Sequence, residues 1–388
     1  MQNFEYCTPT KMIFGKGVVE KLPEVLATIG TKVLMTYGGG SIKRSGLYDT
    51  VKKLLADKFD VTELSGIEPN PKYSSVLEGI RLCRENNIEV ILAVGGGSVL
   101  DCSKAIAGCT LSEGDPWDII TSKVPTTNAL PVVDIITMAA TGSEYDFGGV
   151  ISRPETNDKV GYMNEHLFPK CSLIDPTYTF TVPKNQTVAG VADAMNHILE
   201  TYFNSDPNFL MDGIMETAIK SLIKNVRIVL DEPENYDARA EIFLNCSLAC
   251  NGIYGLGEAP SGWPMHGIEH ALSAYYDITH GVGLAIITPR WLKHIMNEKT
   301  VGRIAQYGRN VFGINEKSDI ETAEKAISAT YDLYESIGIP MHLREVGIDE
   351  SRISEMAHHI AVNEGLNQPY VYAPLNEKDI EEILMASL

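Results

Sequence analysis

The stretch EVILAVGGGS at residues 89–98 decides the fold of the first half of the chain. Its apolar run has the length of a buried strand, and its glycines open a helical pattern that continues through Lys104. The same arrangement occurs upstream, where the run 32–37 leads into GGGS at 38–41. Strands that lead through a short turn into a helix are typical of a parallel α/β sheet.

The alternation continues to about residue 180 and then stops. Helical patterns at 47–55 and 74–85 alternate with strand patterns at 61–64 and 131–136. Beyond that point long helical patterns follow one another with few strand signals, roughly at 187–203, 208–229, 236–254 and 263–276. We therefore predict an α/β dinucleotide-binding domain with a parallel sheet at 1–180 and an all-helical domain at 181–388.

The composition excludes several classes of partner. The 388 residues include 32 Lys and Arg against 51 Asp and Glu, a formal charge of −19, which argues against nucleic acid and anionic membrane surfaces. No apolar run has the length of a membrane span, and the first residues lack the layout of a signal peptide. Seven cysteines without a CxxC pair indicate reduced, mostly buried thiols. We expect a cytoplasmic protein.

Each glycine loop is a candidate phosphate site. Glycines let a phosphate approach the backbone, and the N–H groups at the start of a helix attract anions. Neither loop matches GxGxxG, since Leu100 holds the last glycine position, so two tight strand–helix turns remain an alternative. Two such loops in one sheet favour a dinucleotide. The loop 95–98, followed by Asp101, is the better candidate for the pyrophosphate.

The first loop indicates which dinucleotide. A ribose with a free 2′-hydroxyl usually meets an acid at such a strand end, whereas a 2′-phosphate prefers a cation. Here Tyr37 is followed by glycines, the Ser41 hydroxyl, Lys43 and Arg44, with no acid among them. This pattern favours NADP(H) over NAD(H), although Lys43 and Arg44 as solvated helix charges remain the plainer alternative.

Five residues of the second half form a candidate metal site. DAMNH at 193–197 places Asp193 and His197 four residues apart, on one face of a helix. HGIEHALSAYYDITHG at 266–281 supplies His266, His270 and His280, three of only nine histidines. One carboxylate with two or three imidazoles suits a catalytic divalent metal, iron or zinc, with a position left open.

Two reaction classes compete for this metal. HGIEH at 266–270 fits H-x-x-E-H, a metallohydrolase pattern in which Glu269 acts as general base. That interpretation leaves Asp193 and the glycine loops without a role. A metal-assisted dehydrogenase, in which the ion polarises a carbonyl while hydride passes to or from a nicotinamide, uses all of them.

The chain resembles the iron-containing, metal-dependent alcohol dehydrogenases over essentially its whole length, and within them the NADPH-dependent butanol dehydrogenase and aldehyde reductase branch. The resemblance rests on several motifs: FGKG at 14–17, YGGGS at 37–41, EPNP at 68–71, AVGGGSVLD at 93–101, DPW at 115–117, ATGSE at 140–144, DPTY at 175–178, and the two metal-site stretches. It implies the dehydroquinate synthase-like fold of that family, small aliphatic alcohols and aldehydes as substrates, and a homodimer. Glycerol and other polyol dehydrogenases of the same superfamily remain the nearest alternative.

The resemblance also implies residue roles. The metal ligands would be Asp193, His197, His266 and His280, holding iron or zinc, with manganese, nickel or cobalt also acceptable, while His270 lies by the nicotinamide and relays a proton. The residues that would bind NADP(H) are Gly38, Gly39, Ser41, Lys43, Asn70, Gly96, Gly97, Ser98, Asp101, Thr137, Thr141, Ser143, Lys159 and Tyr178. Ser273 departs from a glycine common in the family and is interpreted as a change in helix packing. Glu269 is interpreted as incidental.

Overall fold

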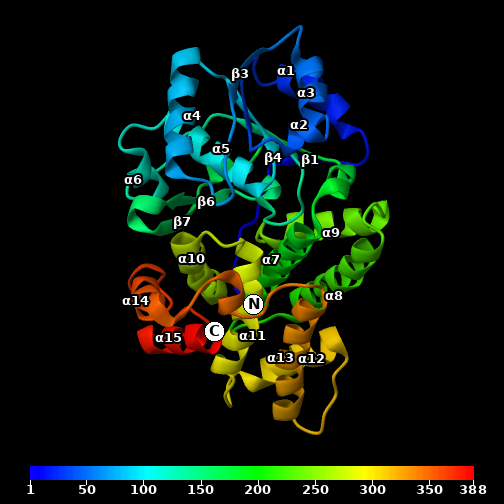
Figure 1. The fold of residues 1–388 in the computed structure, drawn as a ribbon, viewed down its shortest axis with the longest axis vertical. Helices are drawn as coiled ribbons and strands as arrows, with labels where there is room; N and C mark the ends of the chain where they lie inside the picture. Colours follow the sequence, from blue (N-terminus) through cyan, green and yellow to red (C-terminus); the bar gives the residue numbers. More distant parts are fainter. The chain divides into compact units, whose positions relative to one another are not determined.

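The computed structural model describes all 388 residues, and they divide into two compact units (Figure 1). One unit is residues 7–182, and the other is residues 183–388 together with Met1–Tyr6. The sequence assigned the first six residues to the α/β domain. In the structure Gln2 ties them to the helical unit, since its backbone N–H donates to the Gly257 carbonyl at 2.8 Å and its side-chain amide donates to Asp206 at 2.7 Å.

The unit of residues 7–182 is built on a parallel sheet, as the sequence predicted, and the sheet has six strands, of which β1 and β8 were not among the strand patterns read from the sequence. The strand order is β1-β8-β5-β4-β2-β3, so the chain crosses over between strands instead of forming hairpins. The strands are β1 (Lys11–Phe14), β2 (Lys32–Tyr37), β3 (Asp60–Leu64), β4 (Val90–Gly95), β5 (Val132–Ile136) and β8 (Cys171–Ile174). The central strands β2, β4 and β5 are almost fully buried, which explains why their sequences are continuous apolar runs.

Helices cover both faces of this sheet. On one face, side chains such as Met35, Leu92 and Ile135 pack in one cluster with α1 (Leu22–Ala27), α2 (Ser41–Arg44) and α3 (Leu47–Leu55). On the other face lie α4 (Tyr73–Asn86) and α5 (Gly97–Thr110). Gly79 of α4 meets the side chain of Ile106 of α5 so closely that no Cβ would fit there.

A β-hairpin that the sequence did not predict lies outside the main sheet. Strands β6 (Gly148–Arg153) and β7 (Asp158–Met163) pair antiparallel, next to α5 and the short helix α6 (Pro116–Ile120). Asp101 of α5 holds the hairpin: its carboxylate accepts the backbone N–H of Val150 at 3.0 Å, and its backbone carbonyl accepts the Tyr162 hydroxyl.

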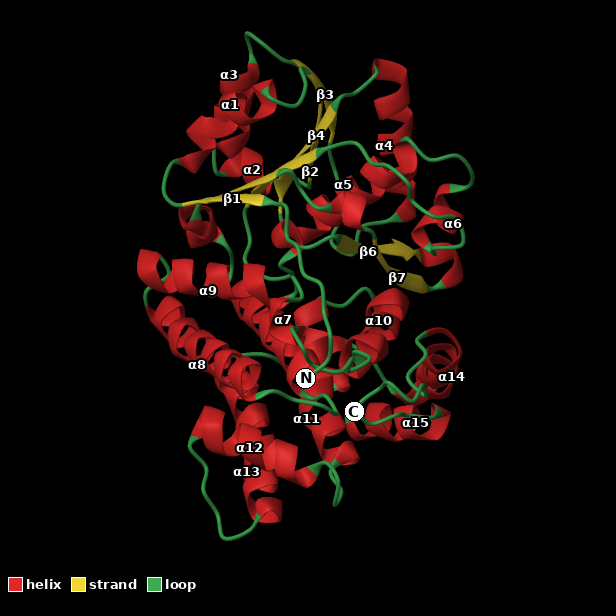
Figure 2. Cartoon of the chain, turned by 180° about the vertical axis from the view of Figure 1, so that it is seen from behind, coloured by secondary structure: helices red, strands yellow, loops and turns green.

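The second unit is entirely helical apart from its loops (Figure 2). Its helices are α7 (Lys184–Tyr202), α8 (Phe209–Asp231), α9 (Tyr236–Ala249), α10 (Pro264–Tyr276), α11 (His280–Ile295), α12 (Val301–Phe312), α13 (Asp319–Ser336), α14 (Ile353–Asn363) and α15 (Glu377–Ala386). Helix α9 ends five residues before the predicted residue 254, ahead of Gly252 at φ +85°. No helix is long and apolar enough to cross a membrane. The predicted architecture, a parallel α/β unit followed by a helical one, is confirmed.

Candidate metal centre

Helix α7 supplies the first pair of predicted ligands. Asp193 and His197 stand four residues apart and therefore project from one face of the helix. Both side chains are buried in the helical unit. The Nε2 atom of His197 lies 3.4 Å from Oδ1 of Asp193.

Helices α10 and α11 supply the second pair. Pro264 opens α10, which carries His266 in its first turn, and His280 is the first residue of α11. The next residue, Gly281, lies against the backbone carbonyl of Ala189 in α7, where a Cβ would collide with it. A glycine after His280 therefore lets α11 approach α7 closely enough for the two pairs of side chains to meet.

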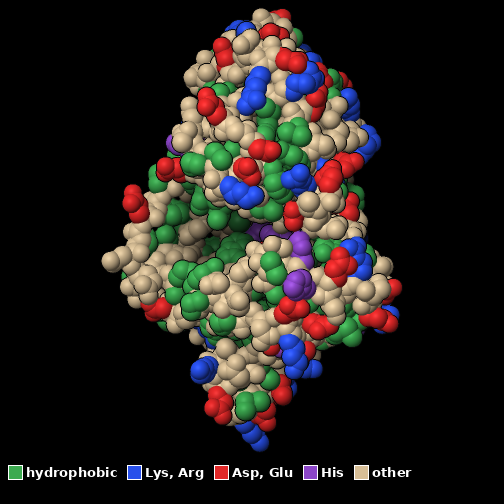
Figure 3. Space-filling view, turned by 90° about the vertical axis from the view of Figure 1, so that its left-hand side faces the viewer, with side chains coloured by type: hydrophobic (Ala, Val, Ile, Leu, Met, Phe, Trp, Pro, Cys, Tyr) green, Lys and Arg blue, Asp and Glu red, His purple; other side chains and the backbone are tan.

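Of the four predicted ligands, the three histidines converge on one carboxylate oxygen of the fourth, Asp193. Oδ1 of Asp193 lies 3.9 Å from Nε2 of His266 and 3.7 Å from Nε2 of His280, in addition to its approach to His197. Asp193, His266 and His280 each bring a candidate ligand atom within 4.8 Å of the other two, and His197 lies outside that set of three. Figure 3 shows histidine side chains gathered at one place on the surface.

The chemistry of this donor set fits a divalent cation. Oδ1 of Asp193 is buried and makes no hydrogen bond within the chain. Burying a carboxylate oxygen without a hydrogen bond or a positive charge beside it costs free energy, and a bound cation would offset that cost. The atoms facing it are all imidazole Nε2 atoms. Three nitrogens and one oxygen match the ligand preferences of zinc and ferrous iron.

Glu200, which the sequence analysis did not identify, holds the ring of His266. Its Oε1 atom accepts the backbone N–H of His266 at 2.8 Å and faces Nδ1 of the same residue at 3.2 Å. Burial raises the pKa of Glu200 to about 8, and the backbone N–H groups of His266 and Met265 oppose that rise. A signal was present in the sequence, because residues 193, 197 and 200 share one face of α7.

Glu269 is not incidental. This fully buried residue of α10 accepts a hydrogen bond from Nδ1 of His280 on one oxygen and from the Ser273 hydroxyl on the other. The Ser273 side chain therefore does more than pack between helices. Because both oxygens of Glu269 already accept hydrogen bonds from the protein, the carboxylate is not oriented to take a proton from water. This argues against Glu269 as the general base of a metallohydrolase.

His270 lies beside the predicted ligands but does not face Asp193. The centroid of its ring is 6.4 Å from that of His266 and 6.1 Å from that of His280. Its Nδ1 atom lies 3.8 Å from a carboxylate oxygen of Glu364, which follows α14. The ring is partly exposed.

The predicted phosphate loops lie at neighbouring strand ends of the α/β unit. Gly38 follows β2, and a Cβ built on it would lie 3.8 Å from Val99 in the first turn of α5, so the two loops are adjacent. Gly96 caps α5, and Gly97 and Ser98 form its first turn. Gly97 also has a packing reason to be glycine, because a Cβ would lie 2.7 Å from Cγ2 of Thr141.

Other predicted coenzyme residues gather around the start of α5. The Thr137 N–H donates to the Gly95 carbonyl at 2.9 Å, and the Ser143 hydroxyl donates to Asp101 at 2.7 Å. Asp101 is buried, and its carboxylate is already bonded to Ser143 and to the hairpin. Burial raises its pKa to about 6.

The remaining predicted coenzyme residues lie elsewhere in the α/β unit. Asn70 has a left-handed backbone at φ +49° just before Pro71. Lys159 is buried in β7, away from the main sheet. Tyr178 packs against the core on the α1–α3 face, where burial raises its pKa to about 12.

Lys43 lies in an aromatic setting that the sequence did not reveal. Its Nζ atom is 5.1 Å from the ring centroid of Tyr37 and 4.8 Å from that of Tyr48. Both tyrosine hydroxyls donate to Glu63 of β3, which also pairs with Lys52 at 2.8 Å. These partners lower the pKa of Glu63 against the opposing effect of its burial.

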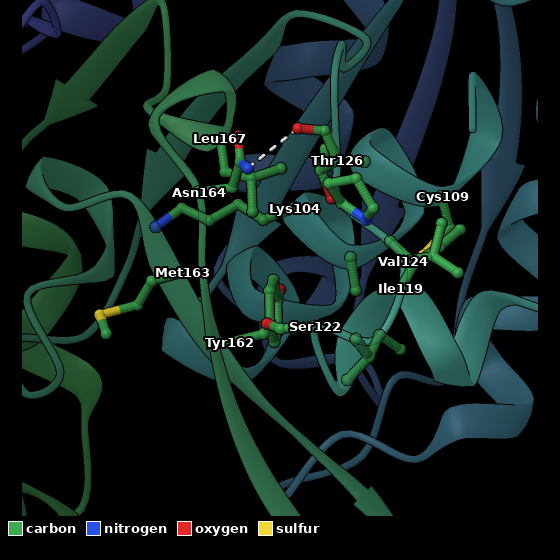
Figure 4. A pocket seen from close by; sticks show the side chains of 14 residues that line it. Lys104, Cys109, Ile119, Ser122, Val124, Thr126, Tyr162, Met163, Asn164 and Leu167 are labelled. Carbon is green, nitrogen blue, oxygen red and sulfur yellow. Dashed lines mark hydrogen bonds between the residues drawn. The ribbon is translucent and has the colours of Figure 1, made fainter.

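A pocket of about 220 Å³ lies in the α/β unit beside α5 (Figure 4). Lys104, Cys109, Tyr162 and Asn164 are among its lining residues, and the Asn164 amide donates to the Thr126 carbonyl at 3.0 Å. The Lys104 ammonium is tied to Asp146 and to three backbone carbonyls. None of the lining residues belongs to the predicted metal or coenzyme sets.

Comparison with known proteins gives matches along the whole chain. Residues 9–176 match the family model "Iron-containing alcohol dehydrogenase", and residues 187–388 match "Fe-containing alcohol dehydrogenase family, C-terminal". NADH-dependent butanol dehydrogenase A of Clostridium acetobutylicum is 45% identical over 390 aligned residues, with 100% of both chains covered. The NADPH-dependent aldehyde reductase YqhD of Escherichia coli is 39% identical, with 91% of each covered. A crystal structure of NADH-dependent butanol dehydrogenase A from Thermotoga maritima superposes with a TM-score of 0.95 at 37% identity, covering 100% of this chain and 99% of the other.

Proposed function

The chain belongs to the iron-containing alcohol dehydrogenase family, and from that premise we propose that it interconverts small aliphatic alcohols and aldehydes of the butanol and butanal type. We propose NADP(H) as the hydride carrier and a divalent cation as the second cofactor. One observation carries the proposal, namely the approach of three imidazole Nε2 atoms to the buried Oδ1 of Asp193.

Asp193, His197, His266 and His280 would hold the cation. When bound there, a divalent cation supplies a Lewis acid that polarises the substrate oxygen. The chain supplies the negative charge and the orientation: Asp193 contributes the anionic oxygen, while Glu200 and Glu269 fix the rings of His266 and His280 through Nδ1. His270, with Glu364 at 3.8 Å, would hold the proton that the alcohol exchanges with solvent.

Residues around the first glycine loop support NADP(H). Lys43 offers a cation there, and the nearby carboxylate of Glu63 is already occupied by Lys52 and two tyrosine hydroxyls. An occupied acid is a poor partner for a ribose 2′-hydroxyl, whereas a cation attracts a 2′-phosphate. The names of the relatives point both ways, because the butanol dehydrogenases are called NADH-dependent and YqhD is called NADPH-dependent.

Elemental analysis combined with an aldehyde assay tests the proposal. The purified protein should contain a divalent metal and should oxidise NADPH with butanal, and butanal should be a better substrate than glyceraldehyde. The variant His266→Ala should lose metal and turnover together, whereas His358→Ala, which changes an exposed histidine of α14, should keep both. Full turnover by metal-free His266→Ala would refute the metal centre. Peptide hydrolysis without aldehyde reduction would refute the reaction class.

A further inference from the structure

The feature that carries a further inference is a three-residue hydrogen-bonded chain in the helical unit. The Ser273 hydroxyl donates to Oε1 of Glu269, and Nδ1 of His280 donates to Oε2 of the same carboxylate. Ser273 and Glu269 stand one turn apart on α10, and His280 opens α11. The chain therefore links two helices through one buried carboxylate.

The positions of the protons in this series of hydrogen bonds follow from the acceptor, the Glu269 carboxylate. An ionised carboxylate only accepts hydrogen bonds, so with Glu269 ionised Nδ1 of His280 carries the hydrogen and Nε2 carries the lone pair. That Nε2 atom faces Oδ1 of Asp193 at 3.7 Å. Glu269 thus selects the one tautomer of His280 that can bind a metal beside Asp193.

The Glu269 side chain is packed closely against α11. It is fully buried on α10, and a Cβ on Gly283 of α11 would lie 2.7 Å from its Cγ and 2.9 Å from its Oε1. The Ser273 hydroxyl occupies the oxygen that His280 does not use, with the Ile278 carbonyl at 3.4 Å as its more distant neighbour. Without that hydroxyl, Oε1 of Glu269 would be buried with one donor fewer.

We propose that Ser273 and Glu269 are positioning residues that set the tautomer and ring orientation of His280 and thereby the affinity and geometry of the metal centre. Ser273 acts only through Glu269. This inference rests on the proposed metal centre but concerns residues that bind neither metal nor substrate.

Cobalt titration tests the proposal on the whole protein without relying on turnover. Metal-free wild type, Glu269→Gln, Ser273→Ala and the double variant are titrated with Co²⁺ against a chromogenic chelator, and the visible spectrum of bound Co²⁺ is recorded. Ser247→Ala is the matched control, because it removes another fully buried hydroxyl of the same unit, whose partner is the Phe243 carbonyl.

Glu269→Gln should weaken Co²⁺ binding by about 10- to 100-fold and change the spectrum, since loss of such a partner usually has an effect of this size. Ser273→Ala should weaken binding several-fold in the wild-type background. It should have no further effect in the Glu269→Gln background, because its partner has already changed. Ser247→Ala should behave as wild type.

Three results would overturn the inference. Unchanged affinity and spectrum in both single variants would remove Ser273 and Glu269 from the metal centre while leaving the proposed function intact. Additive effects in the double variant would show that Ser273 does not act through Glu269. A wild type that binds no Co²⁺ would overturn the proposed metal centre and this inference with it. If Glu269→Gln does not fold, the affinity and spectrum of Ser273→Ala against Ser247→Ala still decide the matter.

Discussion

Glu200 and His266 share a two-point contact: one carboxylate oxygen accepts the backbone N–H of His266 at 2.8 Å and faces its ring Nδ1 at 3.2 Å. His266 lies in the first turn of α10, where backbone N–H groups have no partner within the helix. Glu200 of α7 therefore caps α10 and orients a proposed ligand with the same atom.

Two substitutions at Glu200 should separate these roles. Glu200→Gln keeps an acceptor for the backbone N–H of His266 but cannot carry the negative charge that Glu200 acquires above its pKa of about 8, so above that pH we expect a near-normal melting temperature and metal binding about tenfold weaker. Glu200→Ala should lower both the melting temperature and the metal affinity further than Glu200→Gln does. Calorimetry and metal competition measure the two effects, and Glu324→Gln on the exposed side of α13 is the control. Metal binding by Glu200→Gln as tight as in the wild type would contradict the role assigned to Glu200.

Lys43→Ala should raise KM for NADPH by about 10- to 100-fold and leave KM for NADH unchanged, because a lost ion pair with a 2′-phosphate affects only the phosphorylated coenzyme. Steady-state kinetics with both coenzymes measures this. Lys53→Ala removes an exposed lysine of α3 and should change neither constant. A wild type that prefers NADH, with Lys43→Ala behaving the same, would refute the proposed coenzyme.

Gly281→Ala should destabilise the helical unit by roughly 1–3 kcal/mol and release metal, since the added Cβ would push α11 away from the Ala189 carbonyl and move His280 with it. Thermal unfolding and metal content test this. Gly213→Ala is the matched control in α8, where a Cβ would have nothing within 4 Å, so a gain of about 0.5–1 kcal/mol is expected instead. Equal melting temperatures for the two variants would mean that Gly281 is not required for the approach of α11 to α7.

Asp101 should make the stability of the α/β unit depend on pH. Burial raises its pKa to about 6, while the unfolded chain ionises near the usual value of 3.8. As pH rises, the unfolded state releases this proton first, so the stabilisation present below pH 4 is lost as pH rises through 6. The difference corresponds to roughly 3 kcal/mol.

Asp101→Asn removes this titration and keeps the contacts, because its amide can donate to the Ser143 hydroxyl while its oxygen accepts from Val150. The melting temperature of the wild type relative to the variant should therefore fall between pH 4.5 and pH 7. Asp57→Asn, an exposed change in the same unit, should follow the wild type. Parallel curves for the wild type and Asp101→Asn would show that Asp101 does not titrate in this range.

The sequence predicted those parts of the fold whose signal is local. Strands β2, β4 and β5 are buried on both faces and therefore read as unbroken apolar runs. The β6–β7 hairpin carries no such run, since its strands contain glycines and charged residues and are only partly buried. Its position depends on Asp101, some fifty residues earlier in the chain, a contact that no local pattern reveals.

In the candidate site, too, local signals were predictable from the sequence and contacts between distant residues were not. The spacing of Asp193 and His197 and the grouping of His266, His270 and His280 were enough to propose a metal. The partner that orients the ring of His280 was not predictable, because the Glu269–His280 bond exists only once α10 and α11 pack together. Asp101 is a predicted coenzyme residue, from its place after a glycine loop, and its bonds to the Ser143 hydroxyl and to the hairpin at Val150 could not be predicted from that place.

The assignment of Met1–Tyr6 to the helical unit has a consequence for how the protein is made. Gln2 precedes the α/β unit in the chain, yet its partners Asp206 and Gly257 follow that unit, two hundred or more residues later. During synthesis these contacts cannot form until all of the α/β unit and helix α7 have been made. The helical unit is therefore completed by a segment whose contacts must wait for a whole unit of intervening chain.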